Sequence, residues 1–132
     1  MKIGIIGSGG REHSICYKIK KTNKNVDLFC FPGNAGTSTI SKNVNIDPCD
    51  FDKLYSFVNK NKIELIIVGP ELPLVGGIFD YFEKKNIKIF GPNKKASQLE
   101  GSKIFLKNFC DKNLIPTAKF VEAKSLDDVN KF

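Results

Sequence analysis

The sequence predicts an α/β fold built on a mostly parallel sheet, and three observations support this prediction. Short apolar runs, which are typical of buried strands, alternate with segments whose apolar residues recur at helical spacing. Glycine and proline mark the ends of these runs. The first run leads into a glycine-rich turn that opens a helix, as in many nucleotide-binding folds. Strands that alternate with helices are joined by right-handed crossovers, so we expect them to run parallel.

The first half of the chain contains two strands, two helices and one short extended piece. Phe51, Leu54, Tyr55 and Val58 recur at i, i+3, i+4 and i+7, which predicts an amphipathic helix with Asp50 as its N-cap. The expected elements are a strand at Lys2–Ile6, a helix over 11–22, a strand at Val26–Phe31, an extended piece near Val44–Ile46 and a helix over 50–60.

The next segment repeats the alternation. Glu64–Val68 is a buried apolar run that Gly69-Pro70-Glu71 ends. One helical face follows, after which Asn86 can end the helix in the left-handed conformation. Ile87–Phe90 is a further short strand, closed by Gly91-Pro92. The residues of that helical face are Leu74, Val75, Ile78, Phe79 and Phe82.

Beyond Gly91 the pattern changes, and we expect a second domain to begin. The expected elements are a short helix at Ala96–Glu100, a helix from a Ser102 cap to about Lys112, a strand at Ala118–Val121 and a final helix. Ser125–Asp128 form a capping box at the start of that final helix, and its apolar face begins with Val129 and Phe132. A first domain over residues 1–101 would thus precede an incomplete one over 102–132. We therefore expect the chain to be a fragment of a longer protein.

Composition argues against several classes of protein. The chain has 132 residues and a net charge of +7, but the lysines are scattered and do not alternate with aromatic residues, so we do not expect a nucleic-acid partner. No apolar stretch approaches the roughly 20 residues that span a bilayer. The four cysteines are widely spaced and the chain has one histidine, so we do not expect a zinc site. We expect a cytoplasmic protein with reduced thiols.

The opening glycine loop, Gly7-Ser8-Gly9-Gly10-Arg11-Glu12-His13, does not fit a dinucleotide site. The fingerprint needs a third glycine where Glu12 stands. It also needs an acid at the end of the second strand, where the chain reads Cys30-Phe31-Pro32. Asp27 lies at the opposite end of that strand. We therefore do not expect an NAD or FAD site, and a cofactor titration would settle whether the protein is an NAD-dependent oxidoreductase.

The same loop can still bind an anion. We expect free backbone N–H groups at Gly9 and Gly10 at a helix N-terminus, where the helix dipole favours negative charge. Arg11 is the one arginine of the chain, and its forked cation suits phosphate. The alternative is a tight turn in which Arg11 pairs with Glu12 or another acid. His13 is expected to be a capping or packing residue.

Two other loops follow strand ends on the same expected edge of the sheet. In Gly69-Pro70-Glu71, the Glu71 carboxylate could hold an amine or a sugar hydroxyl, or it could be an ordinary solvated acid. Asn34 could present an amide to a ribose, or it could serve the turn alone. We predict that the glycine loop, Asn34 and Glu71 face one crevice.

Taken together, the motifs resemble the N-terminal part of glycinamide ribonucleotide synthetases, the phosphoribosylamine–glycine ligases. The resemblance spans nearly the whole chain and keeps the order of the motifs. They are Gly-x-Gly-Gly-Arg-Glu-His at 7–13, Pro-Gly-Asn-Ala-Gly-Thr at 32–37, Val-Gly-Pro-Glu at 68–71, Pro-Leu-Val at 73–75, Ile-Phe-Gly-Pro at 89–92 and Gln-Leu-Glu-Gly-Ser-Lys at 98–103.

The resemblance implies a Rossmann-like pre-ATP-grasp domain followed by the start of an ATP-grasp domain. It implies an enzyme of purine synthesis that joins glycine to 5-phosphoribosylamine and converts ATP to ADP and phosphate through a glycyl phosphate. Lys103 would contact ATP, while magnesium (or manganese) would bind beyond Phe132, so the chain alone should be inactive. The implied substrate-binding residues are Gly9, Gly10, Arg11, Glu12, Asn34, Gly69, Pro70 and Glu71.

Two alternatives stay open. Another ATP-grasp carboxylate–amine ligase or carboxylase would share the fold and Lys103. A basic nucleic-acid-binding module would need salt-dependent binding that the scattered lysines do not suggest. The resemblance also implies a monomer at full length, with small-molecule partners and no membrane.

Overall fold

The computed structural model describes residues 1–130, which form two compact units, Met1–Ser97 and the remainder from Gln98. The predicted domain boundary after residue 101 lies four residues further along the chain than this division. Phe132, which the sequence places on the apolar face of the last helix, lies outside the described residues.

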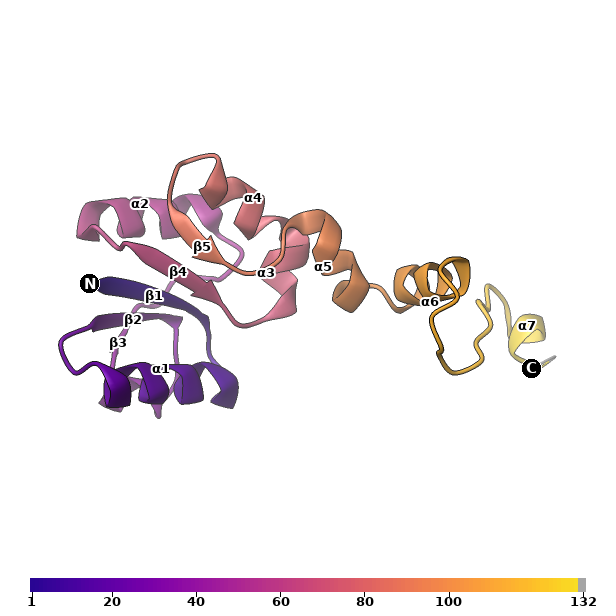
Figure 1. Ribbon diagram of the computed structural model, residues 1–132, viewed down its shortest axis with the longest axis horizontal. Coiled ribbons are helices and arrows are strands. Elements are labelled where there is room, and N and C mark those ends of the chain that lie inside the picture. Colours follow the sequence, from indigo (N-terminus) through magenta and orange to yellow (C-terminus); the bar gives the residue numbers. More distant parts are fainter. Residues whose placement is uncertain (131–132) are drawn as a thin grey trace. The chain divides into compact units, whose positions relative to one another are not determined.

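The first unit is a five-stranded parallel sheet with helices on both faces (Figure 1). The strand order is β3-β2-β1-β4-β5, so the chain moves outward on one side of β1 and then returns to begin β4 on its other side. This confirms the predicted fold class. The elements are β1 (Lys2–Gly7), α1 (Gly10–Thr22), β2 (Asp27–Pro32), η1 (Thr37–Thr39), β3 (Lys42–Asn43), α2 (Phe51–Asn61), β4 (Leu65–Val68), α3 (Glu71–Gly76), α4 (Ile78–Glu83) and β5 (Lys88–Phe90).

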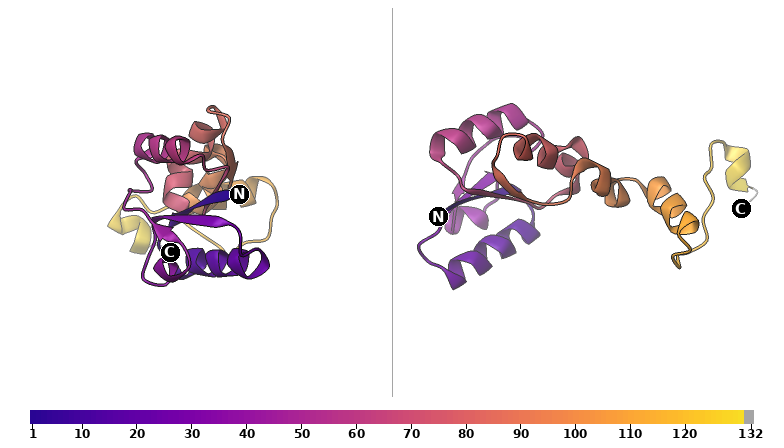
Figure 2. Two further views of the ribbon diagram at one scale, coloured as in Figure 1. Left: turned by 90° about the vertical axis from the view of Figure 1, so that its left-hand side faces the viewer. Right: turned by 45° about the horizontal axis from the view of Figure 1, so that its top comes forward.

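Alternation along the strands divides the core into two layers. Helix α1 covers one face of the sheet, while α2 and α4 cover the other, as both views in Figures 1 and 2 show. Ile5 and Cys30 belong to the α1 layer, whereas Ile6 and Phe31 belong to the opposite layer. These four residues are fully buried, because each central strand has a helical layer on either side.

The α2–α4 layer is the larger of the two and carries a chain of aromatic contacts. Phe31 packs edge-on against Phe57, with ring centroids 5.4 Å apart. The Lys85 ammonium lies 4.3 Å from the ring centroid of Tyr55 and 4.9 Å from that of Tyr81. Such cation–π contacts stabilise an exposed edge by about 0.5–1 kcal/mol each.

Several predicted helix ends are confirmed. The Asp50 carboxylate accepts a hydrogen bond from the Lys53 N–H, as an N-cap does. Asn86 has φ of 57°, the left-handed conformation that was expected of it. The single helix expected after Glu71 is instead two short helices, because Gly77 adopts φ of 101° and separates them.

The third strand lies earlier than predicted. Pairing with β2 involves Lys42 and Asn43 rather than Val44–Ile46. The Val44 N–H still donates to the Cys30 carbonyl at 2.8 Å, after which the chain leaves the sheet. The apolar Val44 and Ile46 instead pack on the larger core layer.

The second unit is helical where it is regular. Ser102 caps α6 (Lys103–Lys112) through the Phe105 N–H, and Ser125 and Asp128 form the predicted capping box of α7 (Leu126–Asn130). Helix α5 (Lys94–Gly101) spans the division between the units. The strand predicted at Ala118–Val121 is wrong. The Ala118 carbonyl accepts a hydrogen bond from the Lys107 side chain instead, and no strand pairs with this segment in the described chain.

Candidate functional site

Three loops meet at the carboxyl edge of the sheet, around the ends of β1, β2 and β4. The register places Gly7 beside Pro32, so the glycine loop and the Asn34 loop leave the sheet side by side. The Glu12 side chain lies against Gly69, which brings the third loop to the same place. The chain changes direction between β1 and β4, and such a switch point is where ligands bind in open parallel sheets.

Asn34 holds its own loop against the glycine loop. Its side-chain amide donates to the carbonyl oxygens of Ser8 at 2.8 Å and Gly9 at 3.1 Å. Its Oδ1 accepts from the Thr37 N–H at 2.9 Å. All polar atoms of this side chain therefore bond within the protein, which favours the structural alternative for Asn34.

Thr37 and Asn43 complete this network, and neither stood out in the sequence. The Thr37 hydroxyl accepts from the Asn34 N–H at 2.7 Å, and the Asn43 amide donates to the Asn34 carbonyl at 2.7 Å. Thr37 is fully buried although it is polar. The available signal was a cluster of residues that form side-chain turns, directly after a buried strand.

Glu12 is a buried acid inside the glycine loop. Its side chain is nearly covered, and its Oε2 accepts a 2.6 Å hydrogen bond from the Gly9 N–H. Its Oε1 has no hydrogen-bond partner among residues 1–130, and the nearest cationic atom is Arg11 Nε at 3.5 Å. That contact is an ion pair rather than a hydrogen bond.

Three glycines make room for this carboxylate. A Cβ at Gly69 would lie 1.9 Å from Glu12 Oε1, one at Gly7 would lie 2.8 Å from Glu12 Cδ, and one at Gly9 would lie 2.9 Å from Oε2. Real carbon atoms do not approach so closely, so a side chain at Gly69 would displace Glu12. The glycines at the ends of β1 and β4 thus serve an acid of the protein itself.

The predicted anion cradle is therefore wrong in one part. The Gly9 N–H is not free, because Glu12 already occupies it with a negative charge. The Gly10 N–H donates to no protein group in the described chain, and Gly10 faces open space. Any anion would therefore bind at Gly10 and Arg11 rather than across both glycines.

The Arg11 side chain stays available beside its contact with Glu12. It is 61% exposed, and its guanidinium donates no hydrogen bond to residues 1–130. It stands at the edge of an apolar groove between α1 and strands β4 and β5, which Ile15, Ile67 and Phe90 help to line. The ion pair with Glu12 that the structural alternative predicts is present, but it involves the Nε atom of the Arg11 guanidinium.

The remaining predicted residues divide between the two units. Glu71 is exposed at the first residue of α3, directly after Gly69 and the N-cap Pro70. His13 packs on the Asn34 loop, since a Cβ at Gly36 would lie 2.7 Å from its Nδ1. Lys103 is exposed at the first residue of α6, in the second unit. The structure thus gathers the predicted residues of the first unit at one edge of its sheet, whereas Lys103 belongs to the second unit.

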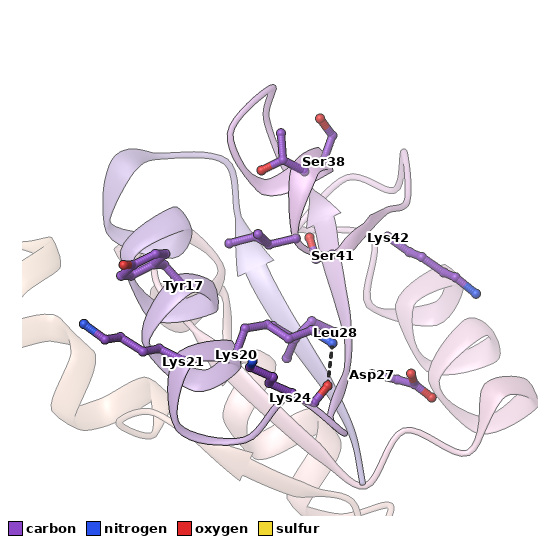
Figure 3. A pocket seen from close by; sticks show the side chains of 11 residues that line it. Tyr17, Lys20, Lys21, Lys24, Asp27, Leu28, Ser38, Ser41 and Lys42 are labelled. Atoms are coloured by element: carbon purple, nitrogen blue, oxygen red, sulfur yellow. Dashed lines mark hydrogen bonds between the residues drawn. The ribbon is translucent and has the colours of Figure 1, made fainter.

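A second hollow lies toward the C-terminal half of α1, where lysines surround a floor that includes Leu28 (Figure 3). The Lys20 ammonium is held by the Val26 and Lys24 carbonyls. In Figure 3 the Lys21 and Lys42 side chains extend to opposite sides. The positive charges do not converge on one point, so this hollow is not a built anion site.

The described residues hold no group of three or more histidine, cysteine or acidic side chains that could bind a metal ion. None of the helices in residues 1–130 is long and apolar enough to cross a membrane.

Comparisons with known proteins show the family of this chain. Residues 1–100 match the family described as phosphoribosylglycinamide synthetase, N domain. The chain is 46% identical over 132 residues to the phosphoribosylamine–glycine ligase of Caldanaerobacter subterraneus subsp. tengcongensis, covering 100% of this chain and 32% of the relative. It is 44% identical over 128 residues to the ligase of the same name from Rhodopirellula baltica, covering 97% of this chain and 29% of the relative. The chain thus spans about a third of the length of these relatives.

Solved structures show the same fold. The phosphoribosylamine–glycine ligase of Thermotoga maritima superimposes with a TM-score of 0.71 at 29% identity, over 99% of this chain and 29% of the other. The N5-carboxyaminoimidazole ribonucleotide synthetase of the same organism gives a TM-score of 0.72 at 21% identity, over 99% and 36%. The second likeness shows the fold alone. The match over residues 1–100 decides the family, and the chain belongs to the phosphoribosylglycinamide synthetases.

Proposed function

We propose that the full-length protein is a phosphoribosylamine–glycine ligase of purine biosynthesis. The observation that carries this proposal is the family match over residues 1–100, together with relatives named for this activity that are 46% and 44% identical. In the reaction, the glycine carboxylate takes the γ-phosphoryl group of ATP, which gives glycyl phosphate and ADP. The amine of 5-phosphoribosylamine then attacks the acyl carbon and releases phosphate.

Within this reaction, the described part of the chain would bind the sugar phosphate. The Arg11 fork and the Gly10 N–H are the available anion-binding groups, and they lie next to each other at the start of α1. The N-terminal end of a helix favours a negative ligand, and a guanidinium matches phosphate through paired hydrogen bonds. A phosphate there would compensate the charge of Arg11, which Glu12 neutralises only along one edge.

Glu12 and Asn34 would act by positioning. The unpartnered Glu12 oxygen is covered, so in this conformation it shapes the loop rather than meeting a ligand. Asn34 holds the carbonyl groups of Ser8 and Gly9, the two residues that precede Gly10. Glu71 is exposed on the neighbouring loop, where its carboxylate would accept a hydrogen bond from the substrate amine or a ribose hydroxyl.

Most of the groups that bind ATP and the metal ion would lie elsewhere in the protein. Residues 1–130 contain no cluster that fits magnesium or manganese, so we derive no metal-dependent step from them. Lys103 is the proposed ATP contact, and the metal ligands and remaining ATP contacts would come from the two thirds of the family length that this chain does not span. We accordingly propose that the chain alone has no ligase activity.

Three further features belong to the same proposal. The full-length protein would be a monomer, would act in the cytoplasm and would use small molecules rather than nucleic acid as partners. The four cysteines are free in the structure, which suits a reducing compartment.

The proposal is tested by the full-length enzyme and its Arg11→Ala variant. Wild-type protein should release ADP only when glycine and phosphoribosylamine are both present. Loss of a charge-assisted hydrogen bond of about 1.5–3 kcal/mol should raise the KM for phosphoribosylamine about ten- to a hundredfold. The KM for ATP should not change.

Lys18→Ala is the matched control, because Lys18 lines the same groove on the same helix. It should leave the KM for phosphoribosylamine within about twofold of the wild-type value. An unchanged KM in Arg11→Ala would leave Arg11 with a structural role only. Full activity with a different amine, and none with phosphoribosylamine, would instead assign the protein to another ATP-grasp reaction.

A further inference from the structure

Two buried cysteines face each other between α1 and β2. The Sγ atoms of Cys16 and Cys30 are 3.3 Å apart, and both side chains are fully buried. They belong to the smaller core layer, which is otherwise aliphatic. Cysteine is a common core residue, but two thiols in direct contact can also react with each other.

The surroundings distinguish the two sulfurs. Cys30 Sγ accepts a hydrogen bond from the Ser41 hydroxyl at 3.2 Å and is also bonded to the Cys16 thiol. These donors, the Cys16 thiol first, lower the pKa of Cys30 to about 7. The pKa of Cys16 is raised, chiefly because its thiol donates this hydrogen bond and because it is buried. Cys30 is thus the sulfur of the pair whose pKa is lowered, and Cys16 the one whose pKa is raised.

We propose that Cys16 and Cys30 form a reversible dithiol–disulfide couple, which a small hydroperoxide oxidises when local opening of this core layer exposes Cys30. The Cys30 thiolate attacks the peroxide, so that an S–O bond forms, the O–O bond breaks and hydroxide leaves. The Cys16 sulfur then attacks the sulfur of the Cys30 sulfenic acid. With hydrogen peroxide as the oxidant, the new S–S bond forms as the sulfenic hydroxyl leaves with the Cys16 thiol proton as water. The hydroxide from the first step takes up the proton that Cys30 released on ionising, so one hydrogen peroxide becomes two molecules of water. A dithiol reductant reverses the step.

The couple connects the elements that carry the candidate site. Cys16 lies one helical turn after Glu12 on α1, and Cys30 lies four residues before Asn34. A disulfide bond of about 2.05 Å requires the two sulfurs to approach from 3.3 Å, either by rotation of the side chains or by a shift of α1 against β2. A shift of α1 against β2 would also move the loops at their ends, which Glu12 and Asn34 hold in place.

The test uses the 132-residue chain with Cys49→Ser and Cys110→Ser, which leaves only the pair. After exposure to hydrogen peroxide, the protein is unfolded, alkylated and digested without reductant. We expect a mass lower by two hydrogen atoms, loss of both alkylation sites and a Cys16–Cys30 linked peptide that dithiothreitol removes. The melting temperature should rise on oxidation, because the crosslink restricts the unfolded chain.

Two variants assign the roles. Cys16→Ala should leave a Cys30 sulfenic acid that dimedone traps, whereas Cys30→Ala should leave Cys16 a thiol over the same exposure. Because either variant could unfold, its circular dichroism is recorded first. If a variant does not fold, the proposal is decided by the linked peptide from the chain that keeps both Cys16 and Cys30. In the chain with all four cysteines, Cys49 is exposed and reports oxidant strength. If both buried thiols remain alkylatable after Cys49 is fully oxidised, the proposal is overturned.

Discussion

The two units of the chain have similar apolar patterns and very different interiors. The first unit buries aromatic and aliphatic side chains on both faces of its sheet, including Phe31 and Phe82, which are fully buried. Among the described residues from Gln98 onward, Cys110 is the one buried hydrophobic residue. Phe105 and Phe109 of α6 stack on each other with ring centroids 6.4 Å apart, yet each is 41% exposed.

The difference shows what helical periodicity can and cannot determine. Helices α2 and α6 both have an apolar stripe and a capped start. Helix α2 lies on a sheet, so Leu54 and Val58 are fully buried, whereas the unit that holds α6 contains no sheet in its described part. Amphipathicity therefore predicts a helix, and burial depends on whether another layer is present.

The largest expected effect comes from removing one aromatic ring in each unit. Phe82→Ala should destabilise the chain by about 3–5 kcal/mol, because it leaves a cavity in a closed core. Phe109→Ala should cost less than about 1 kcal/mol, because its ring is already partly in water. Denaturant unfolding, followed by circular dichroism, measures both. Similar costs for the two substitutions would contradict the comparison.

A smaller effect is expected where the backbone passes close to Glu12. Gly69→Ala places a carbon where Glu12 Oε1 lies, so it should destabilise the first unit by about 1–3 kcal/mol. Most of that cost should disappear in a Glu12→Ala background, because the two sites are in contact. Gly10→Ala, which points into open space, is the control and should be nearly neutral. Strict additivity of Gly69→Ala and Glu12→Ala would show that the two residues do not compete for space.

A pH-dependent effect is expected at the edge of the larger core layer. The hydrogen bond from the Tyr81 hydroxyl to the Asp52 carboxylate raises the pKa of Tyr81 to about 12. The raised pKa belongs to the folded chain, so the stabilisation is complete below the ordinary tyrosine pKa of about 10 and is lost as the pH rises through about 12. Because the pair is exposed to solvent, it should contribute less than about 1 kcal/mol.

Absorbance of tyrosinate, titrated in Asp52→Asn, tests this effect. One tyrosine should ionise at a lower pH than in the wild-type chain, while Asp47→Asn should leave the titration curve unchanged. Identical curves for wild type and Asp52→Asn would show that the hydrogen bond does not persist in solution.

The smallest effect should follow removal of the second unit. A chain that ends at Gly101 keeps every strand and both core layers, so its melting temperature should stay within a few degrees of that of the whole chain. Residues 98–132 alone should show little cooperative unfolding, because the described residues from Gln98 onward bury almost no apolar surface. Calorimetry of both pieces measures this, and loss of folding in the shorter N-terminal chain would mean that the first unit is not independent.

The sequence predicted the parallel sheet well, because each central strand is a continuous apolar run that only a buried position explains. The sequence predicted secondary structure less well where another hydrogen bond or a glycine conformation replaces the expected strand or helix. The carbonyl of Ala118 is used by Lys107, and Gly77 divides what read as one helix. The contact of Cys16 with Cys30 depends on how α1 lies against β2, which spacing along the chain cannot show.

The candidate site was predicted in place but not in detail. Glycines and a lone arginine at a strand end indicated the edge where the loops meet. No local pattern indicates that the Glu12 carboxylate accepts a hydrogen bond from the Gly9 N–H, because that bond depends on the space left by Gly69, more than fifty residues away along the chain. The roles of Arg11, Glu71 and Lys103 stay predictions.

The central claim is that the first unit binds a sugar phosphate through Gly10 and Arg11. It is tested most directly by adding ribose 5-phosphate to the isotopically labelled 132-residue chain and following its amide NMR signals. We predict saturable shifts at Gly10, Arg11 and their neighbours, which are lost in Arg11→Ala and kept in Lys18→Ala. Shifts that centre on the lysine-lined hollow of Figure 3, or equal shifts in Arg11→Ala, would contradict the account.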